Sequence, residues 1–134
     1  MAESMIHGSE DHPSVQLHRD VSSIAEARSW LVSVLNERYR VPEEKIGVAA
    51  VLTSELVTNA LEHTASEPVI AIEESGTRIV VAVHDEDPSE PIVRDLDPLR
   101  VGGNGLRIVD EWSDEWGVRR VPDRGKVVWF AIGR

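Results

Sequence analysis

Three polar side chains stand one turn apart in a segment that is otherwise mostly apolar. Glu55, Asn59 and His63 lie at positions i, i+4 and i+8 of VAAVLTSELVTNALEH, which spans residues 48–63. A helix turns about 100° per residue, so the three share one side, among residues that should be buried. An unpartnered buried carboxylate or amide costs about 1–3 kcal/mol or more. They therefore need a polar partner. That partner could be a protein group, such as a backbone carbonyl, or it could be a ligand.

A fourth polar residue, Asp85, ends a segment rich in β-branched residues that predicts a strand over 77–84. In a strand, alternate side chains share a face, so Asp85 points to the same face as Ile79, Val81 and Val83. That face should be the covered one, and a carboxylate there needs a hydrogen-bond donor. The alternative is that Asp85 simply caps a turn at the strand end.

A glycine-rich stretch at 102–105 follows a long proline-containing passage that begins at Glu86, and it precedes a helical pattern that starts at Leu106. The free amides at a helix start can hold phosphate, although such glycines can also merely permit a tight turn. The chain lacks the Walker pattern, and no strand leads directly into the glycines as a dinucleotide fingerprint requires. The order of these features would suit a nucleotide pocket: an inward Glu and Asn, then an inward Asp, a long loop and a glycine-capped helix.

The elements that must position these residues follow from periodicity. Ser23 and Glu26 form a capping-box pair that predicts a first helix ending near Arg38, and a second helix is predicted from about Pro42 to His63. Ser75 and Gly76 read as a two-residue hairpin turn. The predicted strands cover 14–18, 69–73, 77–84, 115–121 and 126–132. Three tryptophans are expected to pack between elements: Trp112, Trp116 and Trp129.

Composition excludes several classes of function. The 134 residues, 41% hydrophobic, fit one globular domain at 14–134 after a flexible tail at 1–13. With no cysteine, thiolate catalysis and Cys-based zinc sites are excluded. The net charge of −10 disfavours direct nucleic-acid binding. No signal layout and no apolar run of about 18 residues is seen, so we expect a cytoplasmic protein with no membrane segment.

Four segments together resemble the sequence blocks of the GHKL ATPase superfamily. They are LTSELVTNALEH at 52–63, VAVHDEDP at 81–88, GGNGLRIVD at 102–110 and GKVVWFAI at 125–132. The chain is most similar to the small stand-alone bacterial anti-sigma-factor serine/threonine kinases that have a histidine-kinase-like ATPase domain. It differs from the pattern after Asp85, where Glu86, Asp87 and Pro88 replace glycines, and at Val127, where a threonine is common.

The resemblance implies a role for each matching residue. Asn59 would coordinate a Mg²⁺ ion that bridges the ATP phosphates, Glu55 would act as the base, and Asp85 would accept from the adenine amino group. Residues 86–102 would form a lid over ATP. The start of the third helix would bind the nucleotide through Gly103, Asn104, Gly105 and Leu106. This chemistry suits Mg²⁺, which prefers oxygen ligands, and phosphoryl transfer, which depends mostly on positioning and charge neutralisation.

The expected fold is an α/β (α+β) two-layer sandwich, in which a mixed, mostly antiparallel sheet is covered on one face by three helices. The leading hypothesis is a serine/threonine kinase that uses ATP and Mg²⁺, phosphorylates an anti-anti-sigma (STAS-type) protein and sequesters a sigma factor. The alternatives are a regulatory module that binds ATP without transferring phosphate, and a plain interaction domain. The resemblance also makes a homodimer possible.

Overall fold

A computed structural model describes residues 12–63, 66–87 and 105–134. The predicted elements all appear, most with ends within two residues of the expected ones. Their bounds are β1 Ser14–Gln16, α2 Ser22–Glu37, α3 Glu43–His63, β2 Val69–Ser75, β3 Arg78–Asp85, α4 Gly105–Trp112, β4 Glu115–Arg120 and β5 Lys126–Gly133.

The five strands form one sheet in the order β1-β2-β3-β5-β4, and each of these pairings is antiparallel. β3 lies at the centre and pairs with β5 along its whole length, from Arg78 opposite Gly133 to Asp85 opposite Lys126. The β2–β3 turn consists of Gly76 and Thr77, one residue later than predicted, because Ser75 still pairs with Arg78. Gly76 has a φ of 62°, which a glycine adopts without steric cost.

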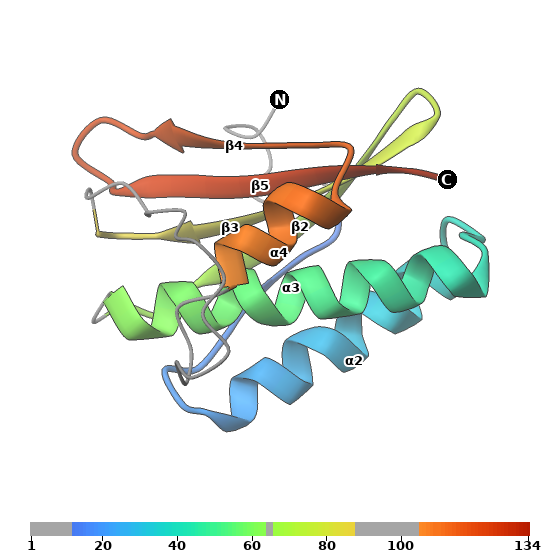
Figure 1. Ribbon diagram of the computed structural model, residues 1–134. Coiled ribbons are helices and arrows are strands. Elements are labelled where there is room, and N and C mark those ends of the chain that lie inside the picture. Colours follow the sequence, from blue (N-terminus) through green and yellow to red (C-terminus); the bar gives the residue numbers. More distant parts are fainter. Residues whose placement is uncertain (1–11, 64–65, 88–104) are drawn as a thin grey trace.

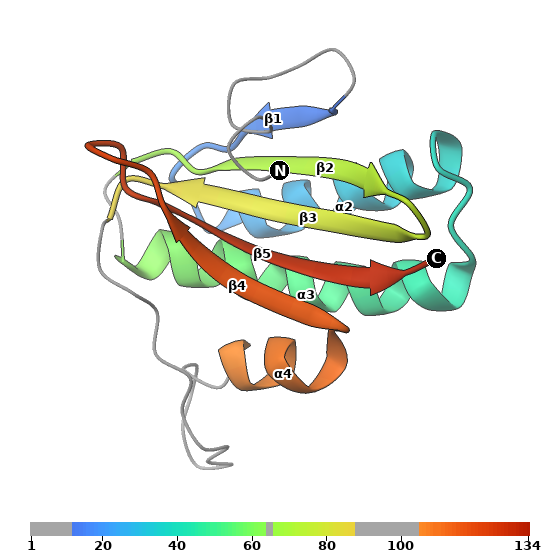
Figure 2. The same cartoon turned by 90° about the horizontal axis from the view of Figure 1, so that it is seen from above.

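The three helices lie together on one side of the sheet, which gives the two-layer sandwich expected from the sequence (Figure 1). α3 packs between α2 and α4 and contacts β3 and β5. Both views show α3 and β3 running in the same direction and ending on the same side, from which α4 starts and runs back (Figures 1 and 2). This arrangement brings the carboxyl ends of α3 and β3 to the side on which the amino end of α4 lies.

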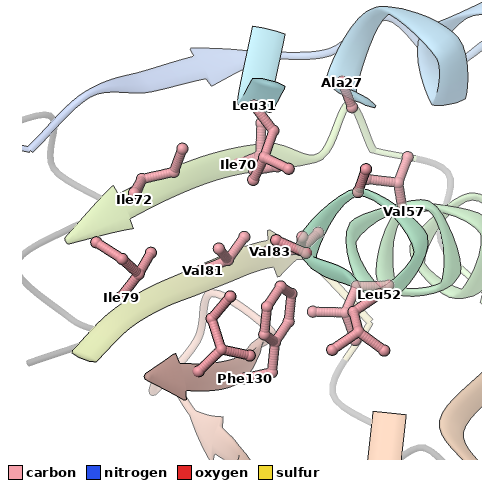
Figure 3. Close-up of a cluster of buried hydrophobic side chains, with 14 of the residues drawn as sticks. Ala27, Leu31, Leu52, Val57, Ile70, Ile72, Ile79, Val81, Val83 and Phe130 are labelled. Atoms are coloured by element: carbon pink, nitrogen blue, oxygen red, sulfur yellow. The ribbon is translucent and has the colours of Figure 1, made fainter. Parts of the chain in front are cut away.

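The core fills the space between the sheet and the helices. Ile79, Val81 and Val83 project from β3 toward the helical layer, as the alternation predicted, and Phe130 projects from β5 (Figure 3). From the other side, Leu52 of α3 is fully buried in the same cluster. The smaller cluster on the opposite face of the sheet includes Ala71, Ala82 and Val127.

The start of α2 differs from the predicted capping box. The Ser23 hydroxyl is buried and donates to the backbone carbonyl of Asp20 at 2.7 Å, so it does not cap the helix. Instead the Asp20 carboxylate accepts from the Ser22 N–H at 3.0 Å. The pairing with Glu26 was therefore wrong, since Ser23 already lies inside the helix and Asp20 supplies the acceptor.

Of the three tryptophans expected to pack between elements, two make packing contacts and one is exposed. Trp116 donates from Nε1 to the Asp110 carboxylate at 2.8 Å and so connects β4 to α4. Trp129 packs on the sheet face away from the helices, over Gly117, where a Cβ would lie 2.9 Å from its ring. Trp112 is 52% exposed, so the prediction that it packs between elements was wrong. It is the last residue of α4.

Of the tail predicted at 1–13, only the last two residues fall in the described part. The Pro13 carbonyl accepts from the Ile72 N–H at 2.9 Å, and a His12 ring nitrogen lies 3.6 Å from a Glu73 carboxylate oxygen. Within the described ranges, no helix combines the length and the apolar character needed to cross a bilayer.

Candidate functional site

Helix α3 carries Glu55 and Asn59 between its buried and its exposed sides. Its outer side is polar, and there the Ser54 and Thr58 hydroxyls donate to the carbonyls of the preceding turn at 2.9 and 2.7 Å. Leu56 faces the core. Glu55 and Asn59 are half-buried, one turn apart. Both side chains therefore lie at the border of the core, as predicted, while the side chain of His63 falls outside the described part.

The Asn59 amide makes no hydrogen bond to any residue that the structure describes. One alternative raised by the sequence was that a neighbouring backbone carbonyl satisfies this amide, and the described residues supply no such contact. A half-buried amide without a protein partner is suited to an external ligand, since its oxygen and NH₂ group keep their bonding capacity.

Glu55 is the acidic group of α3 whose protonation the fold alters. Burial raises the pKa of the Glu55 carboxyl, and the negative charge of Glu62 raises it further. A carboxylate with a raised pKa is a better proton acceptor near neutral pH. Glu55 therefore has the electrostatic environment that a general base needs.

Asp85 is the last residue of β3 and is 1% exposed. One of its oxygens, Oδ1, accepts from the Asp87 N–H at 2.9 Å and from Lys126 Nζ at 3.0 Å. The first bond is the turn cap that the sequence offered as an alternative, and the second is a buried ion pair. Burial raises the pKa of Asp85, while the hydrogen bond and charge of Lys126 oppose that rise. Within the described residues, the second oxygen Oδ2 receives no hydrogen bond.

Sequence reasoning gave no role to Lys126, the first residue of β5. Its side chain is only 2% exposed, and its ammonium also donates to the Asp87 carbonyl at 2.9 Å. The alternation that placed Asp85 could have placed it, because Lys126, Val128, Phe130 and Ile132 share the helix-facing side of β5. A lysine in line with those apolar residues was the available signal.

Gly125 allows β5 to begin against the end of β3. It has a φ of 85°, and a Cβ there would lie 2.1 Å from the Asp85 carbonyl oxygen and 2.4 Å from Glu86 Cα. Both contacts are with backbone, which cannot move aside as a side chain would. A glycine is therefore required if Lys126 is to lie beside Asp85.

The third part of the expected site is described incompletely. Gly103, Asn104 and most of the predicted lid at 86–102 lie outside the described residues. Gly105 is the first residue of α4, so the helix starts one residue before the helical pattern predicted from Leu106. Leu106 is 6% exposed and packs in the main core, so a ligand at this helix start would meet its backbone amide rather than its side chain.

The described residues contain no group of three or more His, Asp or Glu side chains able to hold a metal ion. An all-protein metal cage is therefore absent from this part of the chain. Mg²⁺ is commonly held by one or two protein oxygens together with substrate phosphates and water. The half-buried Asn59 fits that mode, because its amide oxygen is not used by the described protein.

The two-layer sandwich, with three helices on one face of an antiparallel sheet, is consistent with the histidine-kinase-like ATPase fold. The family model described as the histidine kinase-like ATPase domain matches residues 17–132, so the chain belongs to that family. This confirms the resemblance to the GHKL ATPases that the four sequence blocks indicated.

Several solved structures share the fold, among them two that cover most of this chain. One is the structure of the RsbU and RsbW domains of Rv1364c from Mycobacterium tuberculosis, with 17% identity and a TM-score of 0.69 over 91% of this chain. This chain spans only 32% of the length of that one. The other is the histidine kinase domain of a blue-light activated kinase from Erythrobacter litoralis EL346, with 24% identity and a TM-score of 0.50, covering 93% of this chain and 69% of that one. A comparison with curated protein sequences gives no match.

Proposed function

We propose that this protein is an ATP- and Mg²⁺-dependent serine/threonine kinase of the anti-sigma type, which phosphorylates a STAS-type anti-anti-sigma protein and sequesters a sigma factor. The observation that carries the ATP-binding part is the buried Asp85 carboxylate at the end of β3, in a chain of the histidine kinase-like ATPase family. The anti-sigma part is supported by the sequence resemblance and by the fold shared with a structure that contains an RsbW domain.

In this proposal Asp85 accepts from the adenine amino group through Oδ2, the oxygen that faces no described donor. The amide oxygen of Asn59 ligates Mg²⁺, and the backbone at Gly103, Asn104, Gly105 and Leu106 holds the phosphates. Bound Mg²⁺ supplies charge neutralisation on the phosphate oxygens. The amino end of α4 contributes its free amides and the positive end of its dipole to the same charge.

Glu55 acts as the base in the proposed transfer. Its carboxylate takes the proton of a partner serine hydroxyl while that oxygen bonds to the γ-phosphorus and the bond between the γ-phosphorus and the bridging oxygen breaks. ADP leaves with the electron pair of that bond. The raised pKa of Glu55 supports this role, because burial and the charge of Glu62 make the carboxylate a stronger base than an ordinary glutamate.

A second candidate function is a regulatory module that binds ATP without transferring its phosphate. It comes from the sequence departure at Val127, where a threonine is common. The Val127 side chain is buried on the sheet face away from the helices, so a residue at this position does not face the Asp85 carboxylate. The group beside Asp85 is Lys126 instead.

Phosphoryl transfer separates the two candidates. Purified protein is incubated with labelled ATP, Mg²⁺ and candidate STAS-type proteins, and label on a partner serine is the expected result. We expect Glu55→Ala to lower the rate by about 100-fold or more, since a positioned base contributes about 10²–10⁴-fold. Glu43→Ala, at the exposed start of the same helix, is the matched control and should keep the rate. ATP binding without label on any partner would favour the module.

The acid limb of the pH–rate profile should depend on Glu62. Glu55 works ionised, so the rate falls as the pH drops through its raised pKa, above the range of an ordinary glutamate. Glu62→Gln removes one cause of that rise and should move the acid limb of kcat/KM to lower pH, while the larger effect of burial remains. Glu43→Gln should leave the limb in place. Identical limbs for Glu62→Gln and the unmodified protein would show that Glu55 is not the titrating base.

A further inference from the structure

The Asp85–Lys126 ion pair is buried at the place where the proposed function puts the base of the nucleotide. Asp85 is 1% and Lys126 is 2% exposed, and their charged atoms lie 3.0 Å apart. Replacing such a pair by well-packed apolar residues is often neutral or stabilising, because desolvation of two charges offsets their attraction. Stability alone therefore does not account for a lysine in line with Val128 and Phe130.

We propose that Lys126 is a specificity-determining residue for the base: it keeps Asp85 a carboxylate with Oδ1 occupied, so that Oδ2 can only accept and the site selects a 6-amino purine over a 6-oxo purine. The inference rests on the proposed nucleotide function. Lys126 acts through Asp85 and is a positioning residue, since its ammonium is turned to Asp85 and to the Asp87 carbonyl.

The geometry fixes which oxygen meets the base. Oδ1 accepts one hydrogen bond from Lys126 and one from the Asp87 N–H, and Lys126 also donates to the Asp87 carbonyl. These three bonds tie the carboxylate plane to β5 and to the turn after β3. Because Gly125 lets the two backbones approach, the lysine reaches this position directly opposite Asp85 in the strand pairing.

Protonation of Asp85 decides what the base site accepts. A carboxylate only accepts hydrogen bonds, whereas a protonated carboxyl can also donate one and could then satisfy a 6-oxo group. Burial favours the protonated form of Asp85, as does the charge of Asp87. Glu55 and Glu62 on α3, the helix packed against β3, carry the same sign. Lys126 on β5 is the cation that opposes them, so its removal should let Asp85 hold a proton.

The test compares Mg·ATP with Mg·ITP, whose base carries a 6-oxo group, by calorimetric titration at about pH 6 and about pH 9. For the unmodified protein we expect ATP to bind about tenfold or more tightly than ITP at both pH values, from the usual strength of a charge-assisted hydrogen bond. For Lys126→Met we expect the preference to fall to about threefold or less near pH 6 and to recover as the pH is raised to about 9, because a higher pH favours the ionised carboxylate.

Two further variants separate charge from packing. Lys126→Gln keeps a donor without the charge, and it should also lose preference near pH 6, which keeps the test open if Lys126→Met does not fold. Val128→Ala removes packing from the next helix-facing position of the same strand and should keep the preference at both pH values. A Lys126→Met or Lys126→Gln protein that keeps the full preference near pH 6 would overturn the inference. Unmodified protein that binds ATP and ITP equally would overturn it too, whereas failure to bind either nucleotide would overturn the proposed function itself.

Discussion

Gly125→Ala is expected to lower the free energy of unfolding by about 4 kcal/mol, from backbone strain and overpacking of about 1–3 kcal/mol each. The φ of 85° disfavours any residue with a Cβ, and the new methyl would lie 2.1 Å from the Asp85 carbonyl oxygen. The neighbouring atoms belong to the backbone of Asp85, the last residue of β3, and of Glu86 after it, so the start of β5 would have to move to relieve the clash. Such a shift would also separate Lys126 from Asp85.

Gly76→Ala is the matched control, because Gly76 also has a positive φ, of 62°, but no atom lies within 4 Å of an added Cβ. It should cost only the conformational term, about 1–2 kcal/mol. Urea unfolding of both variants, followed by circular dichroism, measures the difference. Equal losses for the two variants would show that the close approach of β5 to β3 at Gly125 is not present in solution.

Weakening of Mg·ATP binding by about 10- to 100-fold is expected for Asn59→Ala and for Asp85→Asn, from the 1.5–3 kcal/mol typical of hydrogen bonds to charged groups. The two variants differ in what else they disturb. Asp85→Asn leaves the Lys126 ammonium buried without its carboxylate, and breaking a buried pair in this way costs about 3–5 kcal/mol of stability. Its affinity must therefore be measured under conditions where the variant is shown to be folded.

Two controls match these variants. Asp123→Asn removes the same charge from an exposed position in the β4–β5 turn, where φ is 62° and asparagine is well tolerated. Thr58→Ala changes the residue next to Asn59. The Thr58 hydroxyl donates to the backbone carbonyl of Ser54, within the same helix. Neither should change the affinity more than about twofold. Unchanged affinity in both Asn59→Ala and Asp85→Asn would mean that the nucleotide site is elsewhere.

The sequence predicted the fold well because burial follows periodicity here. Pro42 and the acidic residues after it located the start of α3 to within one residue, and the alternation in β3 assigned Asp85 to the covered face. Predictions based on local chemistry did less well. The Ser22 N–H at the start of α2 donates to the Asp20 carboxylate, and the predicted Ser23–Glu26 pair does not form, because several residues can compete for the same free amides and only the backbone path decides among them.

The site was predictable only as far as single segments reveal it. The inward direction of Asp85 follows from its own strand, but its partner comes from a strand far along the chain. The pairing of Asp85 with Lys126 depends on the register between β3 and β5, two strands that no turn connects directly. Sequence patterns do not report such a register. Trp112 was misjudged for a related reason, since helical spacing gives the face of a residue but not where its neighbours end.

Titration of ATP into the unmodified protein and into Asn59→Ala, once with Mg²⁺ and once without it, tests most directly whether α3 and β3 together form a nucleotide site. Binding that depends on Mg²⁺ in the unmodified protein, and that is about 10- to 100-fold weaker in a folded Asn59→Ala protein, is the predicted result. Absence of binding to the unmodified protein at about millimolar nucleotide, a concentration that would reveal even about −4 kcal/mol of binding free energy, would contradict the proposed function.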